Sequence, residues 1–496
     1  MRYQLLFCSF FFFCLTATAE TAMINRQFLE AEIQDVKKAA ALPSGTAIAV
    51  VKEDKIIFEA YLGFQHIENQ IPVDAQTQFY IASVTKPFTA LNALLDSHKR
   101  AMSLQTNVSD MFPDFSLSNR EQVTIAELLT HRSSINNLPL VLATAYSGVH
   151  SPDSLTRLVN QFSSASSEPV GQFKYTNVGY NIYGIYADRV FNQSWQSRLQ
   201  SQVFAPAAMQ LTSAYRSGLD EDGHIALPYS LLSDERATAL YLEKSDATMH
   251  SAGGIFSTAS DLGRFLIAQL NNGVIDGKAV FPPSVIARSQ QQQAETNHRY
   301  QDFERDGYAW GWYTGDYKGN AMLHHFGGFA GAHAHLSFMP SKRIGIVVLN
   351  NEDFLSTRLT SIIADYLYGA LLAEEGIETK IAERIEGLKT KLAGLDGILA
   401  KEQNKLLSRE WILTLDAGEY EGVYTHSLLG DIEIRRNNKK TFDVTWGAMK
   451  SDSLGMNEAN KIRVELEPNN GTVITFNVEH AVVSLTYAGI EFTKMR

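Results

Sequence analysis

Ser83 and Lys86 lie three residues apart in the segment Ser83-Val84-Thr85-Lys86, a Ser-x-x-Lys pattern. If a helix begins at Ser83, both side chains share one helical face and the ammonium group can reach the hydroxyl group. The positive end of the helix dipole would also favour a negatively charged serine oxygen. A serine hydroxyl is a weak nucleophile until a base removes its proton, and a buried lysine with a lowered pKa can be that base. The pattern therefore predicts a serine nucleophile, although two residues at this spacing also occur by chance.

Two later segments contain groups that could assist such a serine. In Tyr175-Thr176-Asn177 the phenol can relay a proton, and the amide can hold a lysine or a substrate amide. In His325-Phe326-Gly327-Gly328 the glycine pair precedes a predicted strand, where a ligand can approach the backbone closely. A backbone N–H group at that edge, together with the N–H of Ser83, could form an oxyanion hole. Each of these short patterns is common on its own.

The surrounding elements predict a mixed fold. Residues 45–62 have the pattern of two strands joined by a charged turn, and residues 84–95 have that of a helix. A mostly helical stretch follows to about residue 270, residues 333–350 return to strand character, and residues 355–372 are predicted to be helical. Strands at both ends with helices between them indicate one sheet built from distant parts of the chain, an α/β or α+β layout.

The character of the chain changes near residue 374. Over residues 374–410 we expect a connecting helix that packs on a neighbouring domain, and the alternative is a dimer seam. The apolar residues that repeat there with heptad spacing are Ile381, Ile385, Leu388, Leu392, Leu395 and Leu399. Short alternating strands then fill residues 411–496, which predicts a small all-β barrel or sandwich.

The first nineteen residues have the three parts of a secretory signal. One positive charge at Arg2 precedes an apolar run from Leu5 to Leu15, and Ala17-Thr18-Ala19 is a cleavage-site pattern. The run is too short to cross a bilayer, which takes about 20 residues. We expect cleavage after Ala19 and a periplasmic or secreted protein without an integral membrane segment. The alternative is a short hydrophobic anchor at the N-terminus.

The composition argues against several other classes of protein. The 496 residues include two cysteines, Cys8 and Cys14, and both lie in the predicted signal, so the mature chain would offer no thiol for catalysis, disulfides or zinc. The net charge of −11 argues against a nucleic-acid partner, which requires a basic face. His333 and His335 share one strand face but lack the following Asp-His of a zinc hydrolase. We therefore expect neither a metal nor another cofactor.

The order and rough spacing of the three short motifs resemble the serine β-lactamase and penicillin-binding-protein superfamily, most closely its class C β-lactamase, DD-peptidase and esterase branch. The resemblance covers roughly residues 30–370. It implies a β-lactamase/transpeptidase-like antiparallel sheet flanked by a helical subdomain, in a hydrolase domain of residues 20–373. The last hundred residues resemble a β-rich domain that is attached to some members. The flanking segments that carry the resemblance are IASVTKPFTA, TIAELLTHRSSI, YTNVGYNIYG, SAGGIFSTASDLGRF and YAWGW.

The resemblance also implies a role for each motif residue. Ser83 would be the acylated nucleophile, and Lys86 and Tyr175 would share the work of general base and proton shuttle. Asn177 would position Lys86 and the substrate amide. The backbone N–H groups of Ser83 and Gly328 would form the oxyanion hole.

The third motif departs from the family pattern at two positions. His325 stands where class C β-lactamases have lysine, as it does in some DD-peptidases and esterase relatives, and Gly327 would keep the strand edge clear. Phe326 replaces a threonine whose hydroxyl helps to bind the substrate carboxylate. Loss of a hydrogen bond to a charged group costs about 1.5–3 kcal/mol. An ester or amide without that carboxylate therefore fits better, and we expect faster turnover of short p-nitrophenyl esters than of a chromogenic cephalosporin.

The sequence thus predicts an exported serine hydrolase that acts through a Ser83 acyl-enzyme on a small ester, amide or D-amino-acid-containing substrate. One alternative is β-lactamase or DD-carboxypeptidase activity. Another is a non-catalytic protein that kept the fold and binds peptidoglycan fragments or a partner. The expected partner is a small molecule or a peptide, and the sequence does not predict the oligomeric state.

Overall fold

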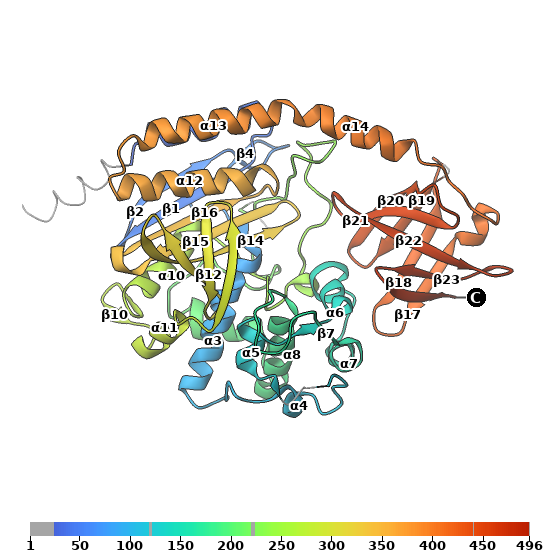
Figure 1. The fold of residues 1–496 in the computed structure, drawn as a ribbon, viewed down its shortest axis with the longest axis horizontal. Helices are drawn as coiled ribbons and strands as arrows, with labels where there is room; N and C mark the ends of the chain where they lie inside the picture. The colour runs from blue at the N-terminus through green and yellow to red at the C-terminus, as the bar shows by residue number, and fades with distance from the viewer. Residues whose placement is uncertain (1–23, 119–121, 220–223, 440, 496) are drawn as a thin grey trace, which may run out of the picture.

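The computed structural model describes residues 24–118, 122–219, 224–439 and 441–495 (Figure 1). The predicted signal sequence and its cleavage site lie outside the described residues. Within the described ranges, no helix combines the length and the apolar character that a membrane crossing requires.

The larger part of the molecule is organised around one antiparallel sheet of eight strands, in the order β11-β12-β13-β14-β15-β16-β1-β2. β1 pairs with β16, and Thr46 lies opposite Asn350, so strands from the two ends of this part of the chain are neighbours. The predicted assembly of one sheet from distant segments is confirmed. The strands are β1 (Thr46–Lys52), β2 (Lys55–Leu62), β11 (Ala294–Tyr300), β12 (Phe303–Tyr308), β13 (Tyr313–Tyr317), β14 (Asn320–Phe329), β15 (Ala332–Met339) and β16 (Ile344–Asn350).

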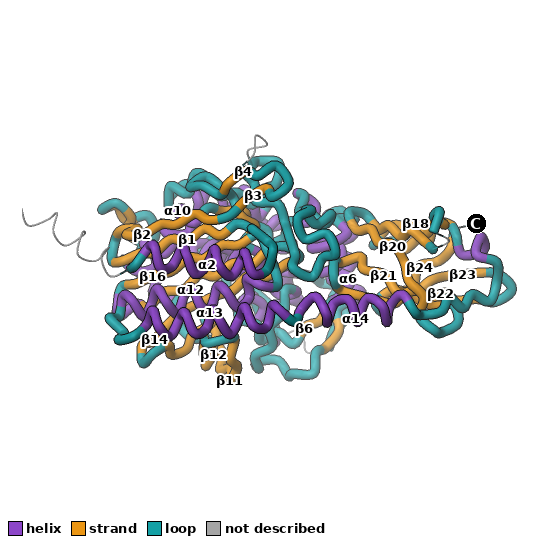
Figure 2. The backbone as a smooth tube through the Cα atoms, turned by 90° about the horizontal axis from the view of Figure 1, so that it is seen from above, coloured by secondary structure: helices purple, strands orange, loops and turns teal. Residues whose placement is uncertain are grey.

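Helices cover both faces of this sheet (Figures 1 and 2). Successive side chains of a strand point to opposite faces, so β1 serves two cores. Ile48 and Val50 pack in one core with α2 (Arg26–Ala39) and α12 (Leu355–Leu371). Ala49 belongs to the other core, which is formed with helices between residues 85 and 289. The nearly continuous apolar pattern of β1 reflects burial on both faces.

The helical subdomain lies on the second face and contains short helices and two-stranded ribbons. Its helices are α3 (Thr85–His98), α4 (Val108–Met111), α5 (Ile125–Leu129), α6 (Leu138–Leu142), α7 (Pro152–Phe162), α8 (Val178–Phe191), α9 (Trp195–Leu199), α10 (Ala259–Leu270) and α11 (Pro283–Ser289). The short strands are β3 (Phe64–His66), β4 (Ile71–Pro72), β5 (Phe79–Tyr80), β6 (Ile135–Asn136), β7 (Ser164–Ala165), β8 (Phe256–Ser257), β9 (Val274–Ile275) and β10 (Lys278–Ala279).

Two consecutive helices, α13 (Ile377–Ala393) and α14 (Leu395–Leu407), run along one side of the molecule and lead to the C-terminal barrel (Figures 1 and 2). Ile381, Ile385 and Leu388 are buried in α13, which packs on α12 and α2. The first half of the heptad pattern is therefore used within this chain. α14 has no buried residue along its described length.

The C-terminal region forms a closed antiparallel barrel of eight strands, as the all-β pattern predicts. Its strands are β17 (Gly422–His426), β18 (Gly430–Arg436), β19 (Phe442–Trp446), β20 (Met449–Gly455), β21 (Lys461–Glu467), β22 (Asn470–Val478), β23 (Val482–Tyr487) and β24 (Ile490–Lys494). The barrel contacts the helical subdomain directly, because Tyr146 Oη donates to Glu467 Oε1 over 3.1 Å. Asn469 Nδ2 donates to Ser230 Oγ over the same distance.

Candidate active site

Ser83 lies in a single 3₁₀ turn, Ala82–Val84, that leads directly into α3. The sequence predicted a helix over residues 84–95, and the α-helix begins at Thr85. Ala82 has φ +45°, in the left-handed region that a residue with a Cβ rarely adopts. Strain of this kind persists only where the surrounding structure enforces it, and it is concentrated at functional sites. Ser83 itself is half-buried.

Lys86 is fully buried, and its Nζ contacts three oxygen atoms. They are Ser83 Oγ at 2.9 Å, Asn177 Oδ1 at 2.8 Å and Ala252 O at 2.9 Å. None of the three is a carboxylate, and burial lowers the pKa of Lys86 well below the usual range of lysine. The two N–H groups of a neutral amine can donate hydrogen bonds to Asn177 Oδ1 and Ala252 O. The lone pair of the nitrogen then faces the Ser83 hydroxyl. This is the arrangement that a general base requires.

Tyr175 lies on the other side of this pair. Its ring centroid is 4.8 Å from Lys86 Nζ, and its phenol interacts with the Ser83 hydroxyl. Although 37% of the residue is exposed, burial of the phenol raises its pKa above the usual range, and the contact with Ser83 only partly offsets this shift. The phenol therefore stays protonated and is suited to donate a proton.

His131 supports the segment that contains Tyr175. Its carbonyl accepts from Lys174 N–H at 2.7 Å, and its Nδ1 accepts from Thr176 N–H at 3.3 Å. The imidazole ring is 4.5 Å from the Tyr175 ring, measured between centroids. Burial lowers the pKa of His131 well below its usual value, so the ring is neutral. His131 therefore holds Tyr175 in place and, among the described residues, does not itself contact Ser83.

His325 is buried on β14, and its tautomer follows from its contact. Nδ1 lies 2.7 Å from the carbonyl oxygen of Phe326, and since a carbonyl can only accept, Nδ1 bears the proton. Burial, reinforced by Lys86, lowers the pKa of His325 well below its usual value. The other nitrogen, Nε2, is buried and has no hydrogen-bond partner among the described residues. His325 therefore offers a neutral acceptor, unlike the cation of a lysine at this position.

Of the two glycines of the third motif, Gly327 lies against the Ala82–Val84 turn that contains Ser83. A Cβ on Gly327 would stand 2.0 Å from the carbonyl oxygen of Ile81 and 3.1 Å from Ser83 N, so this close approach requires glycine. A Cβ on Gly328 would meet no described atom within 4 Å, and the space beside this residue is open.

The N–H of Gly328 does not pair with the neighbouring strand β15. Phe329 pairs with Ala332 across a two-residue turn, and the pair beside such a turn is hydrogen-bonded. Antiparallel pairs alternate, so the Gly328 N–H points away from β15. The register of β13 against β14 ends at the pair Tyr313–His324, before this position. Backbone N–H groups of Gly328 and Ser83 can thus serve one oxyanion.

Phe326 points to the opposite face of the sheet from His325 and Gly327, as strand alternation requires. Its ring packs against Tyr300 at 4.4 Å and His335 at 4.3 Å between centroids. The phenyl ring therefore neither fills the site nor supplies a hydrogen bond there. His333, which shares this face, bonds to Tyr300 and Thr360, and His335 bonds to Ser337. His333 and His335, which the sequence analysis considered as metal ligands, are thus hydrogen-bonded to neighbouring side chains.

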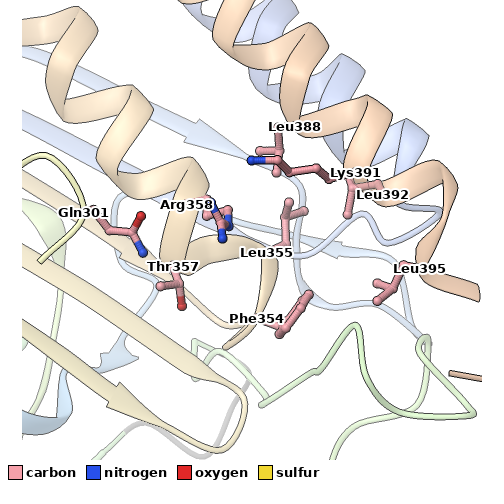
Figure 3. Close-up of a pocket in the computed structure, with 9 residues that line it drawn as sticks. All are labelled: Gln301, Phe354, Leu355, Thr357, Arg358, Leu388, Lys391, Leu392 and Leu395. Atoms are coloured by element: carbon pink, nitrogen blue, oxygen red, sulfur yellow. The ribbon is translucent and has the colours of Figure 1, made fainter. Parts of the chain in front are cut away.

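A separate cavity of about 330 Å³ lies between α12 and α13, and Figure 3 shows the side chains that line it. Four leucines and a phenylalanine form its apolar walls, and Arg358, Lys391 and Thr357 add polar groups. It contains neither Ser83 nor any other residue of the three motifs. The remaining lining residues are Gln301, Phe354, Leu355, Leu388, Leu392 and Leu395.

Comparison with known proteins places this geometry in context. The beta-lactamase family model matches residues 32–364. Protein flp of Staphylococcus aureus (strain MRSA252) is 24% identical over 321 residues, which cover 62% of this chain and 59% of flp. Penicillin-binding protein 4* of Bacillus subtilis is 25% identical over 328 residues, which cover 62% of this chain and 68% of that protein. The chain thus spans less than two thirds of the length of flp.

Solved structures share the fold at low sequence identity. The octameric penicillin-binding protein homologue from Pyrococcus abyssi superposes with a TM-score of 0.63 and 19% identity, over 95% of this chain and all of that one. A class C beta-lactamase gives a TM-score of 0.57 and 18% identity, over 72% of this chain and 97% of that one. At these identities the likeness concerns the fold alone.

Proposed function

The chain belongs to the beta-lactamase family, and from this premise we propose that it is a serine hydrolase in which Ser83 forms an acyl-enzyme. The substrate is a small ester, an amide or a compound that contains a D-amino acid. The observation that supports this proposal most directly is the 2.9 Å contact between Lys86 Nζ and Ser83 Oγ in a buried setting without a carboxylate.

In the acylation step, neutral Lys86 takes the proton of Ser83 as Oγ bonds to the carbonyl carbon of the substrate. The carbonyl oxygen becomes an oxyanion, which the N–H groups of Ser83 and Gly328 stabilise. When the oxyanion collapses, the bond to the leaving group breaks and Tyr175 donates a proton to that group. Lys86 then gives the proton that it took from Ser83 to Tyr175, so both groups regain their starting protonation states and the acyl-enzyme remains.

Deacylation reverses the same steps with water as the nucleophile. Water loses a proton to the Lys86–Tyr175 pair, its oxygen bonds to the acyl carbon, and Ser83 Oγ leaves with a proton. Asn177 holds Lys86 in place throughout, because its Oδ1 accepts a hydrogen bond from Lys86 Nζ over 2.8 Å. The His325 Nε2 acceptor suits a substrate N–H or hydroxyl group, which supports an amide or ester without an adjacent carboxylate.

A fluorophosphonate probe with intact-mass detection tests the nucleophile. We expect one adduct on the wild-type protein and none on Ser83→Ala. The control is Ser97→Ala, which removes a half-buried serine near the end of α3 and should leave the adduct unchanged. An adduct that persists in Ser83→Ala would refute the assignment. No adduct on the wild type would favour the alternative of a non-catalytic binding protein.

Penicillin provides the test of the β-lactamase or DD-carboxypeptidase alternative, which the name of the Bacillus relative favours. A penicilloyl adduct on Ser83 that forms at micromolar penicillin would support it. Absence of that adduct and of any penicillin hydrolysis, with an intact fluorophosphonate reaction, would support the ester or amide assignment.

We also propose that the protein is exported to the periplasm or the medium, because residues 1–19 have the composition of a secretory signal. N-terminal sequencing of the mature protein should begin at Glu20. A protein that retains its first nineteen residues would contradict this part of the proposal.

A further inference from the structure

Arg305 is a cation on β12 without an anionic partner. Among the residues that the structure describes, its guanidinium makes no ion pair, and its buried Nε has no hydrogen-bond partner. The neighbouring acids Glu304 and Asp306 point to the opposite face of the strand, because alternate side chains of a strand do so. A half-buried arginine without an anion is unusual, since burial of an unpaired charge is costly.

Aromatic rings hold the guanidinium in place. Its Cζ lies 3.7 Å from the ring centroid of Tyr313 and 4.7 Å from that of Tyr300, both cation–π contacts. Such stacking fixes the orientation of the planar group and leaves its N–H donors free for a bidentate contact with a carboxylate. The stacked guanidinium of Arg305 is therefore held in an orientation from which it can bind an anion.

The same rings connect Arg305 to the nucleophile. Tyr313 stacks on Tyr175 with centroids 6.1 Å apart and planes 19° from parallel, and it lies 5.6 Å from the His325 ring. The charge of Arg305 acts on both of these groups, because it lowers the pKa of His325 and opposes the rise in the pKa of Tyr175. The ring of Tyr313 thus lies between Arg305 and Tyr175, on the Tyr175 side of the Ser83 site.

We propose that Arg305 binds an anionic group, a carboxylate or its equivalent, on the leaving-group portion of the substrate. This inference rests on the proposed function, in which Tyr175 protonates the leaving group and therefore faces it. An anion that reaches Arg305 must extend past Tyr313, further from the scissile carbonyl than a carboxylate held by the third motif. Phe326 replaces the threonine that would bind a nearby carboxylate, and Arg305 would bind a more distant one. Both differences favour a substrate with an extended acidic leaving group.

Two matched esters test the proposal. The probes are 3-carboxyphenyl acetate and its neutral counterpart, the methyl ester of 3-acetoxybenzoic acid, and release of each phenol is followed by absorbance. We expect the wild type to prefer the acid at least tenfold in kcat/KM, mainly through KM. In Arg305→Gln the ratio of acid to neutral ester should fall about tenfold or more, and Arg305→Lys should restore part of it.

Arg299→Gln is the matched control, because Arg299 lies opposite Glu304 on the same hairpin and its loss changes the net charge equally. It should keep the wild-type ratio. A ratio that is unchanged in Arg305→Gln, or that falls equally in Arg299→Gln, would overturn the proposal. Circular dichroism of each variant identifies one that has failed to fold, and Arg305→Lys then carries the test.

A binding measurement separates this inference from the proposed function. Calorimetry on Ser83→Ala with 3-acetamidobenzoate and its methyl ester requires no turnover. Tighter binding of the acid that is lost in the double variant Ser83→Ala/Arg305→Gln would support the anion site even if no ester were hydrolysed. Equal binding of acid and methyl ester would refute the anion site even if both esters were hydrolysed.

Discussion

Gly327 and Ile81 are in such close contact that a single added carbon atom at Gly327 would stand 2.0 Å from the Ile81 carbonyl oxygen. This contact sets the distance between β14 and the turn that contains the candidate nucleophile. It is made between backbones, so neither partner can rotate away.

Gly327→Ala should therefore abolish most of the hydrolase activity. The added Cβ pushes β14 away from Ser83 N and opens the oxyanion hole, and loss of one oxyanion donor costs about 10²–10³ in kcat. Steady-state ester kinetics measure the effect. Gly328→Ala is the control, because a Cβ there meets open space among described atoms. A Gly327→Ala enzyme of normal kcat would show that the strand position does not matter.

Lys86 should control the acid limb of the pH profile. Only the neutral amine can take the Ser83 proton, and burial lowers the pKa of Lys86 well below its usual value. Activity should therefore persist far below pH 10.5 and decline only when the pH falls through that lowered pKa. Lys86→Gln should remove this limb and reduce kcat by at least about 10²-fold. The profile of kcat/KM against pH is the measurement, and an acid limb that survives in Lys86→Gln would assign it to another group.

His131→Asn should reduce kcat about tenfold through loss of the support under Tyr175. His131 has φ +59°, which asparagine tolerates better than most residues, so the backbone should hold while the ring contact and the bond to Thr176 N–H are lost. His480→Asn, in an exposed turn of the barrel, is the comparison variant. The two kcat values and the fluorophosphonate labelling rates are the readout. Equal values for both variants would mean that Tyr175 does not depend on His131.

His333 should make the fold less stable in mild acid. Burial lowers its pKa to about 4 from the usual 6.5, so between these values the unfolded chain binds a proton that the folded chain does not. The free energy of unfolding should thus fall as the pH drops from 6.5 to 4, by about 3 kcal/mol from this residue.

Urea unfolding at pH 7 and pH 4.5 measures this effect. His333→Gln can keep hydrogen bonds to Tyr300 and Thr360 but cannot titrate, so its stability should depend less on pH than that of the wild type. An identical pH dependence of both proteins would show that other buried histidines account for the acid sensitivity.

Features that arise from local periodicity can be predicted from the sequence. The spacing of Ser83 and Lys86 brings their side chains together wherever a helical turn forms, because residues three apart lie on one face. The alternation of short strands after residue 411 predicted the all-β region. The family resemblance and the antiparallel sheet are confirmed.

The distant groups that complete the site are known only from the packing of the folded chain. Lys86 Nζ binds Ala252 O across 166 positions of sequence, and no local pattern encodes such a contact. The side chain of Phe326 points away from the site because the opposite face of β14 lies against the Ala82–Val84 turn that contains Ser83. The role that we propose for Arg305 depends on stacking with Tyr313 and on the absence of an acid near it in the described chain. Spacing along a chain constrains near neighbours, whereas the partners of a buried charge are set by the packing of elements that the sequence order does not relate.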